Sequence, residues 1–297
     1  MELDLLEENK VFGKNRLSIF AKHVAKASNT DFSILLGGDS SSNYHTREGN
    51  TLKNRAGCWW TKTPYTETTN VIYNYICHGC RFNNRRDAGI RPILPCSLIQ
   101  SVSLNKIREV NEIKEIEYGE YPQYVVDENY SRKLEEAYNN GGLRTTGKKY
   151  TTDSVKYDDY SKKIIPRTFI EYEYNSIKYI RFVGDSNSNR KLLSDGRKIK
   201  IGEIYWVKVE PITWLLDENK NIAITKNIIV SGIQFDNKDR YNGDFKETDI
   251  YKYMNTYLVK DMFNSVSINK KNDNNKEFES INNKIKTLRK RIDDIRK

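Results

Sequence analysis

The sequence of 297 residues contains few cysteines, histidines and prolines: four, three and six, respectively. It also lacks any run approaching the roughly 20 apolar residues that a helix needs to cross a bilayer. Residues 1–8 are acidic and have neither the basic region nor the apolar block of a secretory signal. We therefore expect no contact with a membrane and a cytoplasmic location, unless the chain leaves the cell within a larger assembly.

The small number of cysteines limits the metal sites that the chain can form. Cys77 and Cys80 are two residues apart, but a structural zinc site needs four tetrahedral ligands, usually from two such pairs. Cys58 and Cys96 would have to complete the set from neighbouring strands. We predict no metal and no cofactor, with reduced thiols, since disulfides are rare in the cytosol. A zinc site formed by these four cysteines is the alternative.

Groups suited to catalysis are equally scarce. None of the three histidines stands in a recognisable arrangement with a nucleophile; they are His23, His45 and His78. Glu171 and Glu173 lie on one face of an expected strand, as paired catalytic carboxylates could, but exposed strand glutamates are usually solvated. The sequence thus predicts no catalytic residues and no enzyme activity.

Aromatic and charged residues, in contrast, are abundant, with 20 Tyr, 10 Phe and 4 Trp and with 30% charged residues. This composition is globular, because disordered chains rarely carry so many aromatic side chains. The net charge is +10, and residues 270–297 hold ten Lys and Arg against five Asp and Glu. Such a basic tail binds nucleic acid or another acidic partner, or is simply a solvated helix face.

The last part of the chain has a pattern of its own. Residues 266–277 are mostly polar and indicate a linker. Beyond them apolar residues recur at alternating spacings of three and four, which is a heptad seam: Phe278, Ile281, Ile285, Leu288, Ile292 and Ile295. Because an isolated helix of this length is marginal in water, residues 278–297 are expected to form a coiled coil with a second copy or to pack on the same chain.

Periodicity predicts a mixture of strands and helices. Alternation or short apolar runs indicate strands at residues 30–36, 59–64, 70–78, 89–95, 169–174, 178–183, 204–209, 212–216 and 221–224. A tight turn is expected at Asn175-Ser176, and Pro211 is expected to end a strand. Helical spacing indicates helices at residues 17–24, 131–138 and 248–263, a turn is expected at 118–123, and irregular connections at 97–116 and 145–163.

Several strings occur together over residues 17–263: TDFSILLGG (30–38), WWTKTP (59–64), GIRPILP (89–95), YGEYPQ (118–123) and YWVKVEPITW (205–214). With them the chain resembles a group of proteins from gut Firmicutes, their prophages and their phages, of the formylglycine-generating-enzyme/C-type-lectin class. The resemblance implies an irregular α+β fold anchored by paired Trp side chains. It does not imply formylglycine-generating activity, because these relatives are not recognised by their cysteines.

The order of the motifs is unusual for that class. There, a Trp-rich strand and a Gly-x-Arg strand come late, whereas here Trp59-Trp60 and Gly89-Ile90-Arg91 precede residues 205–214. The resemblance therefore implies one circularly permuted, lectin-like body over residues 1–265, built by residues 1–100 and 115–265.

Residues 79–88 are the best candidate for a ligand-binding surface. Lectin-like folds of this class place a variable ligand surface between the Trp-rich strand and the Gly-x-Arg strand. Arg and aromatic side chains provide bidentate and stacking contacts there, and the candidates are Arg81, Phe82, Asn83, Asn84, Arg85 and Arg86. A solvated loop without a ligand is the alternative.

Together these features predict a non-enzymatic recognition protein, associated with a phage or prophage, that contacts a protein or a glycan through residues 79–88. The alternative is a phage-encoded inhibitor of a nucleic-acid-targeting host defence, in which the basic tail and the arginine cluster contact an effector or its nucleic acid. Either would act in the host cytoplasm or within a virion, and a homo-oligomer would form through the C-terminal helix.

Overall fold

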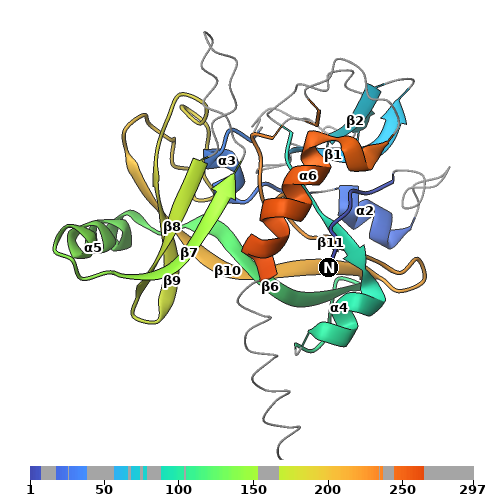
Figure 1. Cartoon of the computed structure of the whole chain (residues 1–297), viewed down its shortest axis with the longest axis horizontal. Coiled ribbons are helices and arrows are strands. Elements are labelled where there is room, and N and C mark those ends of the chain that lie inside the picture. The colour runs from blue at the N-terminus through green and yellow to red at the C-terminus, as the bar shows by residue number, and fades with distance from the viewer. Residues whose placement is uncertain are drawn as a thin grey trace, which may run out of the picture.

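The computed structural model describes residues 1–7, 18–25, 27–38, 57–65, 68–73, 76–78, 88–103, 105–152, 167–233, 235–236 and 244–263. In this part of the chain, helices accompany two sheets whose strand pairs are antiparallel (Figure 1). The described part is therefore an α+β structure. The heptad helix expected at residues 278–297 lies outside it.

The larger sheet has eight strands. Six follow the order β4-β11-β10-β9-β8-β7, while β6 pairs with β10 and β5 pairs with β6. The strands are β4 (Ile93–Pro95), β5 (Arg108–Val110), β6 (Ile113–Val125), β7 (Arg144–Thr152), β8 (Arg167–Tyr174), β9 (Ile177–Val183), β10 (Ile204–Asp217) and β11 (Ile222–Thr225). Because β10 pairs with β6, β9 and β11, this one long strand joins all parts of the sheet.

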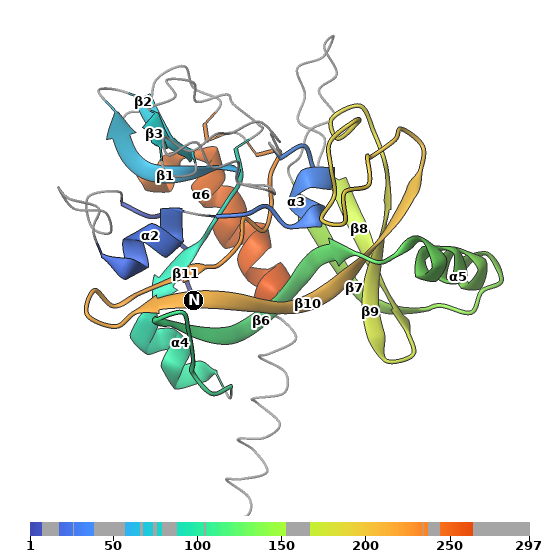
Figure 2. The ribbon, with the colours of Figure 1, turned by 180° about the vertical axis from the view of Figure 1, so that it is seen from behind.

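A smaller sheet and several short helices complete the architecture. The sheet consists of β1 (Cys58–Tyr65), β2 (Thr68–Tyr73) and β3 (Ile76–His78) in sequence order. The helices are α2 (Ile19–Ala25), α3 (Asp31–Leu35), α4 (Cys96–Val102), α5 (Glu128–Asn139) and α6 (Asp249–Tyr253), with η1 (Phe245–Glu247) before α6 and the π-helical turn η2 (Met254–Leu258) after it. Seen from behind, β6 and β10 run from the end near α4 to the end that carries α5 (Figure 2).

The strand expected at residues 30–36 is wrong, because this segment forms the helix α3. Thr30 caps the helix, and its Oγ1 accepts a hydrogen bond from the backbone N–H of Ser33 at 3.1 Å. All five residues of α3 are buried. A short helix that is covered on every side has the same continuous apolar pattern as a buried strand, so periodicity could not separate the two.

Residues 118–123 do not form the expected turn but lie in the middle of β6. Gly119 has a φ of +73°, and a Cβ there would come within 2.8 Å of the Phe263 ring. The register between β6 and β10 shifts between Pro211 and Thr213. Glycine and proline, which usually signal turns, here mark an irregularity inside two continuous strands, so the break expected at Pro211 is also wrong.

Of the other local predictions, some are wrong and one is confirmed. The strand expected at residues 70–78 is two strands, β2 and β3; residues 97–116 contain α4, and residues 145–152 belong to β7. The hairpin of β8 and β9 is confirmed, with a φ of +50° and +62° at Asn175 and Ser176. These positive values are those of a type I′ turn, which matches the twist of the two strands.

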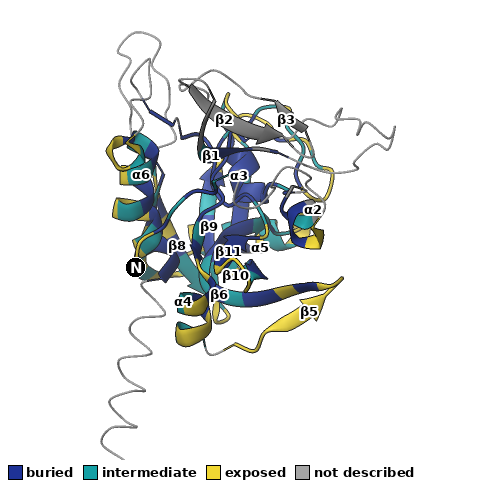
Figure 3. Cartoon of the chain, turned by 90° about the vertical axis from the view of Figure 1, so that its right-hand side faces the viewer, coloured by how far each residue is buried: buried dark blue, intermediate teal, exposed yellow. Residues whose placement is uncertain are grey.

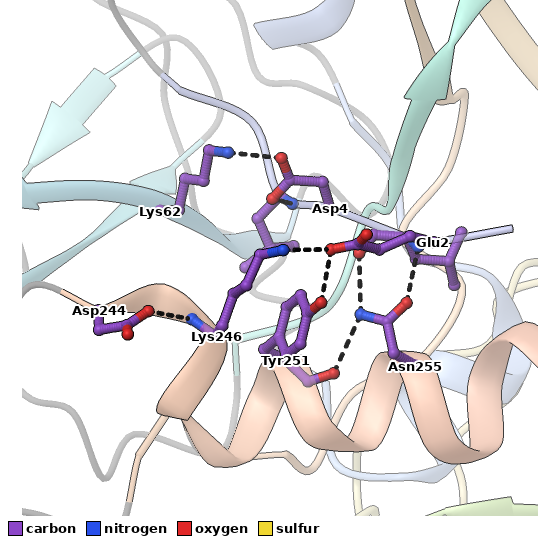
Figure 4. A network of polar contacts seen from close by, with 9 residues as sticks. Glu2, Asp4, Lys62, Asp244, Lys246, Tyr251 and Asn255 are labelled. Atoms are coloured by element: carbon purple, nitrogen blue, oxygen red, sulfur yellow. Dashed lines mark hydrogen bonds and ion pairs between the residues drawn. The ribbon is translucent and has the colours of Figure 1, made fainter.

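The N-terminal segment is fixed between α6, β4 and β1 (Figure 4). Asn255 donates to the carbonyl oxygen of Leu3 and accepts from its N–H, at 3.0 and 2.8 Å, as a neighbouring strand would. Asp4 exchanges two backbone hydrogen bonds with Ile93 and pairs with Lys62. Leu3, Leu5 and Leu6 are fully buried, so the N-terminal segment contributes three side chains to the core.

The four tryptophans are all fully buried. Trp60 and Trp214 belong to one core cluster, Trp59 packs in a second with Leu215, and Trp206 in a third beneath α5. The first two clusters combine residues from the early and late parts of the chain. Outside the core, all three residues of β5 are exposed (Figure 3). The division at residues 265 and 277 remains a prediction.

Candidate functional site

An open polar groove lies where β6 and β10 meet residues 28–29, 194 and 226–227. Its volume is about 580 Å³. Apart from Pro211 and the ring of Tyr124, each lining side chain ends in a hydroxyl, an amide, a carboxylate or an ammonium group. The groove thus combines segments that are far apart in the sequence, and it offers a ligand mainly hydrogen-bonding groups.

Gln123 connects β6 and β10 beside the groove. Its amide nitrogen Nε2 donates to the carbonyl oxygens of Glu210 and Pro211, at 3.0 and 2.7 Å. These two carbonyls lie next to the register shift of β10, where a side chain can replace the interrupted ladder. The nitrogen is therefore used within the protein, and the oxygen Oε1 is the part of the amide that remains as an acceptor.

A second amide is held in the same way on the other wall. Asn227 Nδ2 donates to the hydroxyl of Tyr124 at 2.9 Å. The backbone around Asn227 is fixed by the bridge to residues 28–30, in which Ile228 donates to the Ser28 carbonyl and accepts from the Thr30 N–H. Early and late segments of the chain thus build this wall together.

Arg91 supports the groove from inside the protein. Its guanidinium donates to the carbonyl oxygens of Val24, Thr225 and Lys226 and lies 4.8 Å from the centre of the Trp59 ring. Burial lowers the pKa of Arg91 to about 9. Carbonyl dipoles and an aromatic face stabilise this cation, and they fix the backbone of Lys226 at the groove. The Gly-x-Arg motif was noticed in the sequence, but this role was not predicted.

The three charged side chains of the lining each have an ion-pair partner that is not part of it. Glu117 pairs with Arg108 at 2.7 Å. Glu210 pairs with Lys208 at 2.9 Å. Lys226 pairs with Glu115 at 2.7 Å. The lysine and arginine side chains of these pairs are 42–54% exposed, so water screens all three.

The residues predicted to bind a ligand or to assemble the protein cannot be placed. Residues 81–86 and the heptad positions from Phe278 to Ile295 lie outside the described residues, as does Cys80. Cys96 is buried, and burial raises the pKa of its thiol. Within the described ranges, no group of three or more His, Cys, Asp or Glu side chains is arranged to hold a metal ion.

Glu171 is buried, contrary to the expectation of a solvated strand glutamate. It is 1% exposed and accepts hydrogen bonds from the hydroxyls of Thr146 and Tyr150. Its neighbour Glu173 instead pairs with the exposed Arg144. The two glutamates therefore do not form a matched acid and base, because β7 covers one of them and leaves the other near water.

A buried charge cluster surrounds Glu171, and sequence patterns gave no sign of it. Lys148 Nζ lies 3.6 Å from the carboxylate of Glu120, and burial lowers its pKa. Asp261, at the end of the helix that follows η2, accepts from the N–H of Thr151 at 2.9 Å. Burial raises the pKa of Asp261 to about 7. This cluster joins the helical residues 259–263 to the edge strand β7.

Comparison of the chain with family models, curated proteins and solved structures gives no match in any of the three. No helix in the described ranges has the length and apolar character required to span a membrane.

Proposed function

We propose that this chain is a non-enzymatic recognition protein that binds a protein or a glycan. Its body would be a circularly permuted member of the formylglycine-generating-enzyme/C-type-lectin class, from a phage or prophage, acting in the host cytoplasm or within a virion. The observation that supports binding is the open groove, which hydrogen-bonding side chains from distant parts of the chain line together.

The way in which the groove is built favours recognition over chemistry. Gln123 and Asn227 are held by hydrogen bonds to the protein, so that they need no rearrangement to receive a ligand. The buried carboxylate of Glu171 accepts from two hydroxyls of the same sheet. Its hydrogen bonds support a structural role, since its partners are groups of the protein itself.

The proposal also includes two segments that lie outside the described residues. The loop at residues 79–88, which follows β3, would add arginine and aromatic contacts to a ligand. Residues 278–297 would assemble copies of the chain through the heptad seam, and several weak sites on one assembly bind more strongly than one.

Two measurements on the full chain test the proposal. Binding to a glycan array, or to a purified phage or host surface protein, supports recognition. If the chain binds no glycan and no such protein, the proposal is contradicted. A titration with short duplex and single-stranded DNA and RNA at low and high salt tests the alternative, because phosphate contacts weaken steeply as salt rises. Salt-sensitive binding to nucleic acid in the absence of any protein or glycan ligand would favour the defence inhibitor.

A further inference from the structure

The groove offers acceptors at its carboxylates and amides, beside hydroxyl groups that can both donate and accept. Gln123 uses both of its amide hydrogens inside the protein and Asn227 uses one, so Oε1, Oδ1 and the second N–H of Asn227 are the amide groups that these bonds leave over. The carboxylates of Glu117 and Glu210 add further acceptors to the lining. A ligand that complements this groove must therefore carry several donors, as a sugar does with its hydroxyl groups.

The charge of the lining indicates that the ligand is not acidic. Glu117 and Glu210 contribute two negative charges, but Arg108 and Lys208 outside the lining pair with them. Lys226 is already paired with Glu115, a residue outside the lining. Counted with these partners, the lining has no net charge. An anionic sugar or a phosphodiester would therefore have to displace a carboxylate from its cation, whereas an uncharged ligand disturbs none of the three ion pairs.

The size and the single ring of the groove agree with a carbohydrate. A volume of about 580 Å³ exceeds what one small ion or water cluster fills and lies in the usual range for small-molecule sites. Most such sites are mainly apolar, whereas this one is mainly polar. Tyr124 provides one half-buried apolar face, which can cover the C–H face of a sugar ring while the polar groups receive its hydroxyls.

We infer that the groove between β6, β10 and residues 226–227 binds an uncharged oligosaccharide, with Tyr124 against a sugar ring and with Glu117, Glu210, Gln123 and Asn227 accepting from its hydroxyls. This inference rests on the proposed recognition function and assigns it a ligand class and a site. Residues 79–88 are not needed for it.

The experiment begins with an array of neutral glucose, mannose, galactose and N-acetylglucosamine oligomers beside sialylated galactose oligomers. The neutral probe retained best is then titrated by calorimetry against the full chain, Glu210→Gln and Lys208→Gln. Glu210→Gln removes a charged acceptor but keeps its shape, and we expect roughly tenfold weaker binding. Lys208→Gln breaks the same ion pair from outside the lining, and we expect unchanged affinity.

A second matched pair guards against a misfolded variant: Glu117→Gln in the lining and Arg108→Gln outside it. Thermal unfolding of all four variants is compared with that of the unchanged chain. Equal affinities for Glu210→Gln, Glu117→Gln and the unchanged chain would overturn the inference. The inference would also be overturned if Lys208→Gln weakened binding as much as Glu210→Gln, and Arg108→Gln as much as Glu117→Gln. The loss of the ion pair, and not the loss of a groove carboxylate, would then explain the weaker binding.

Other outcomes separate this inference from the proposed function. Exclusive binding of sialylated probes, or of a purified protein and no sugar, overturns the glycan groove but leaves a recognition protein. Neutral-sugar binding that is lost in Arg81→Ala/Arg85→Ala/Arg86→Ala and kept in Glu210→Gln moves the site to the loop. Retention of no sugar and no protein contradicts both.

Discussion

The groove and the buried charge cluster contain the same kinds of side chain on the same sheet, but water reaches the groove more than the cluster. In the groove, the cations that pair with Glu117 and Glu210 are about half exposed. In the cluster, Lys148 and Glu120 are only 16% and 23% exposed. Breaking a screened pair costs little, whereas removing one partner from a buried group of charges leaves an uncompensated charge. We therefore assign binding to the groove and stability to the cluster.

The largest effect is expected for Glu171→Ala. This change leaves the hydroxyls of Thr146 and Tyr150 without their shared acceptor in a buried place. We expect the free energy of unfolding to fall by about 4 kcal/mol. The matched control is Glu173→Ala, which removes the exposed pair with Arg144 and should cost less than about 1 kcal/mol. Urea unfolding measures both, and equal losses would remove the distinction between the two regions.

Asp261→Asn should change how stability depends on pH. The pKa of Asp261 is about 7 in the folded chain against an ordinary value of 3.8, so the folded state holds this proton more tightly than the unfolded state does. Its contribution is full below pH 3.8 and is lost as the pH rises through 7. We expect the variant to equal the parent near pH 4 and to exceed it by several kcal/mol above pH 7, since each unit of difference in pKa corresponds to about 1.4 kcal/mol.

Asparagine suits this test because its side-chain oxygen can still accept from the N–H of Thr151. The groups that face Asp261 include Lys148, Lys260 and Tyr121, and both lysines oppose the effect of burial by favouring the charged form. Urea unfolding at several pH values between 4 and 8 gives the difference between the two proteins. A difference that does not vary with pH would show that Asp261 is ionised throughout, as a surface carboxylate is.

Arg91→Lys tests how far the guanidinium group stabilises the backbone behind the groove. Lysine keeps the positive charge but cannot reach the carbonyl oxygens of Val24, Thr225 and Lys226 in the forked geometry of a guanidinium. We expect a loss of about 2 kcal/mol in stability, from one or more buried carbonyls that lose their donor. Differential scanning calorimetry measures this loss, and an unchanged midpoint would mean that the charge alone, and not its shape, matters there.

What the sequence predicted correctly is mostly local. Asn175 and Ser176 specify a tight turn by themselves, and the strands on both sides alternate, so the β8–β9 hairpin was predicted with its turn. The helices at residues 131–138 and 248–263 were predicted from the spacing of their apolar residues, and they are confirmed as α5 and as α6 with its π-helical extension. Such signals lie within a few residues of each other.

The features that the sequence did not predict depend on contacts between distant segments. Glu171 and Glu173 have the same pattern, yet only the first is covered by Thr146 and Tyr150. Gln123 could not be recognised as a link between strands, because its partners are backbone carbonyls almost 90 residues away. The groove itself joins five separate segments, and no periodicity within any one of them indicates a common surface. Local patterns predict elements, but sites of this kind arise from their assembly.

The smallest effect on stability is expected for Glu210→Gln. The carboxylate is paired with Lys208, whose side chain is 42% exposed, and such a pair contributes little because water competes for both groups. We expect the free energy of unfolding to change by less than about 0.5 kcal/mol, measured by urea unfolding beside Glu171→Ala. A loss as large as that of Glu171→Ala would place Glu210 among the structural carboxylates of the sheet. A groove that keeps its stability while one of its carboxylates is neutralised has, by contrast, side chains that folding does not require and that a ligand can use.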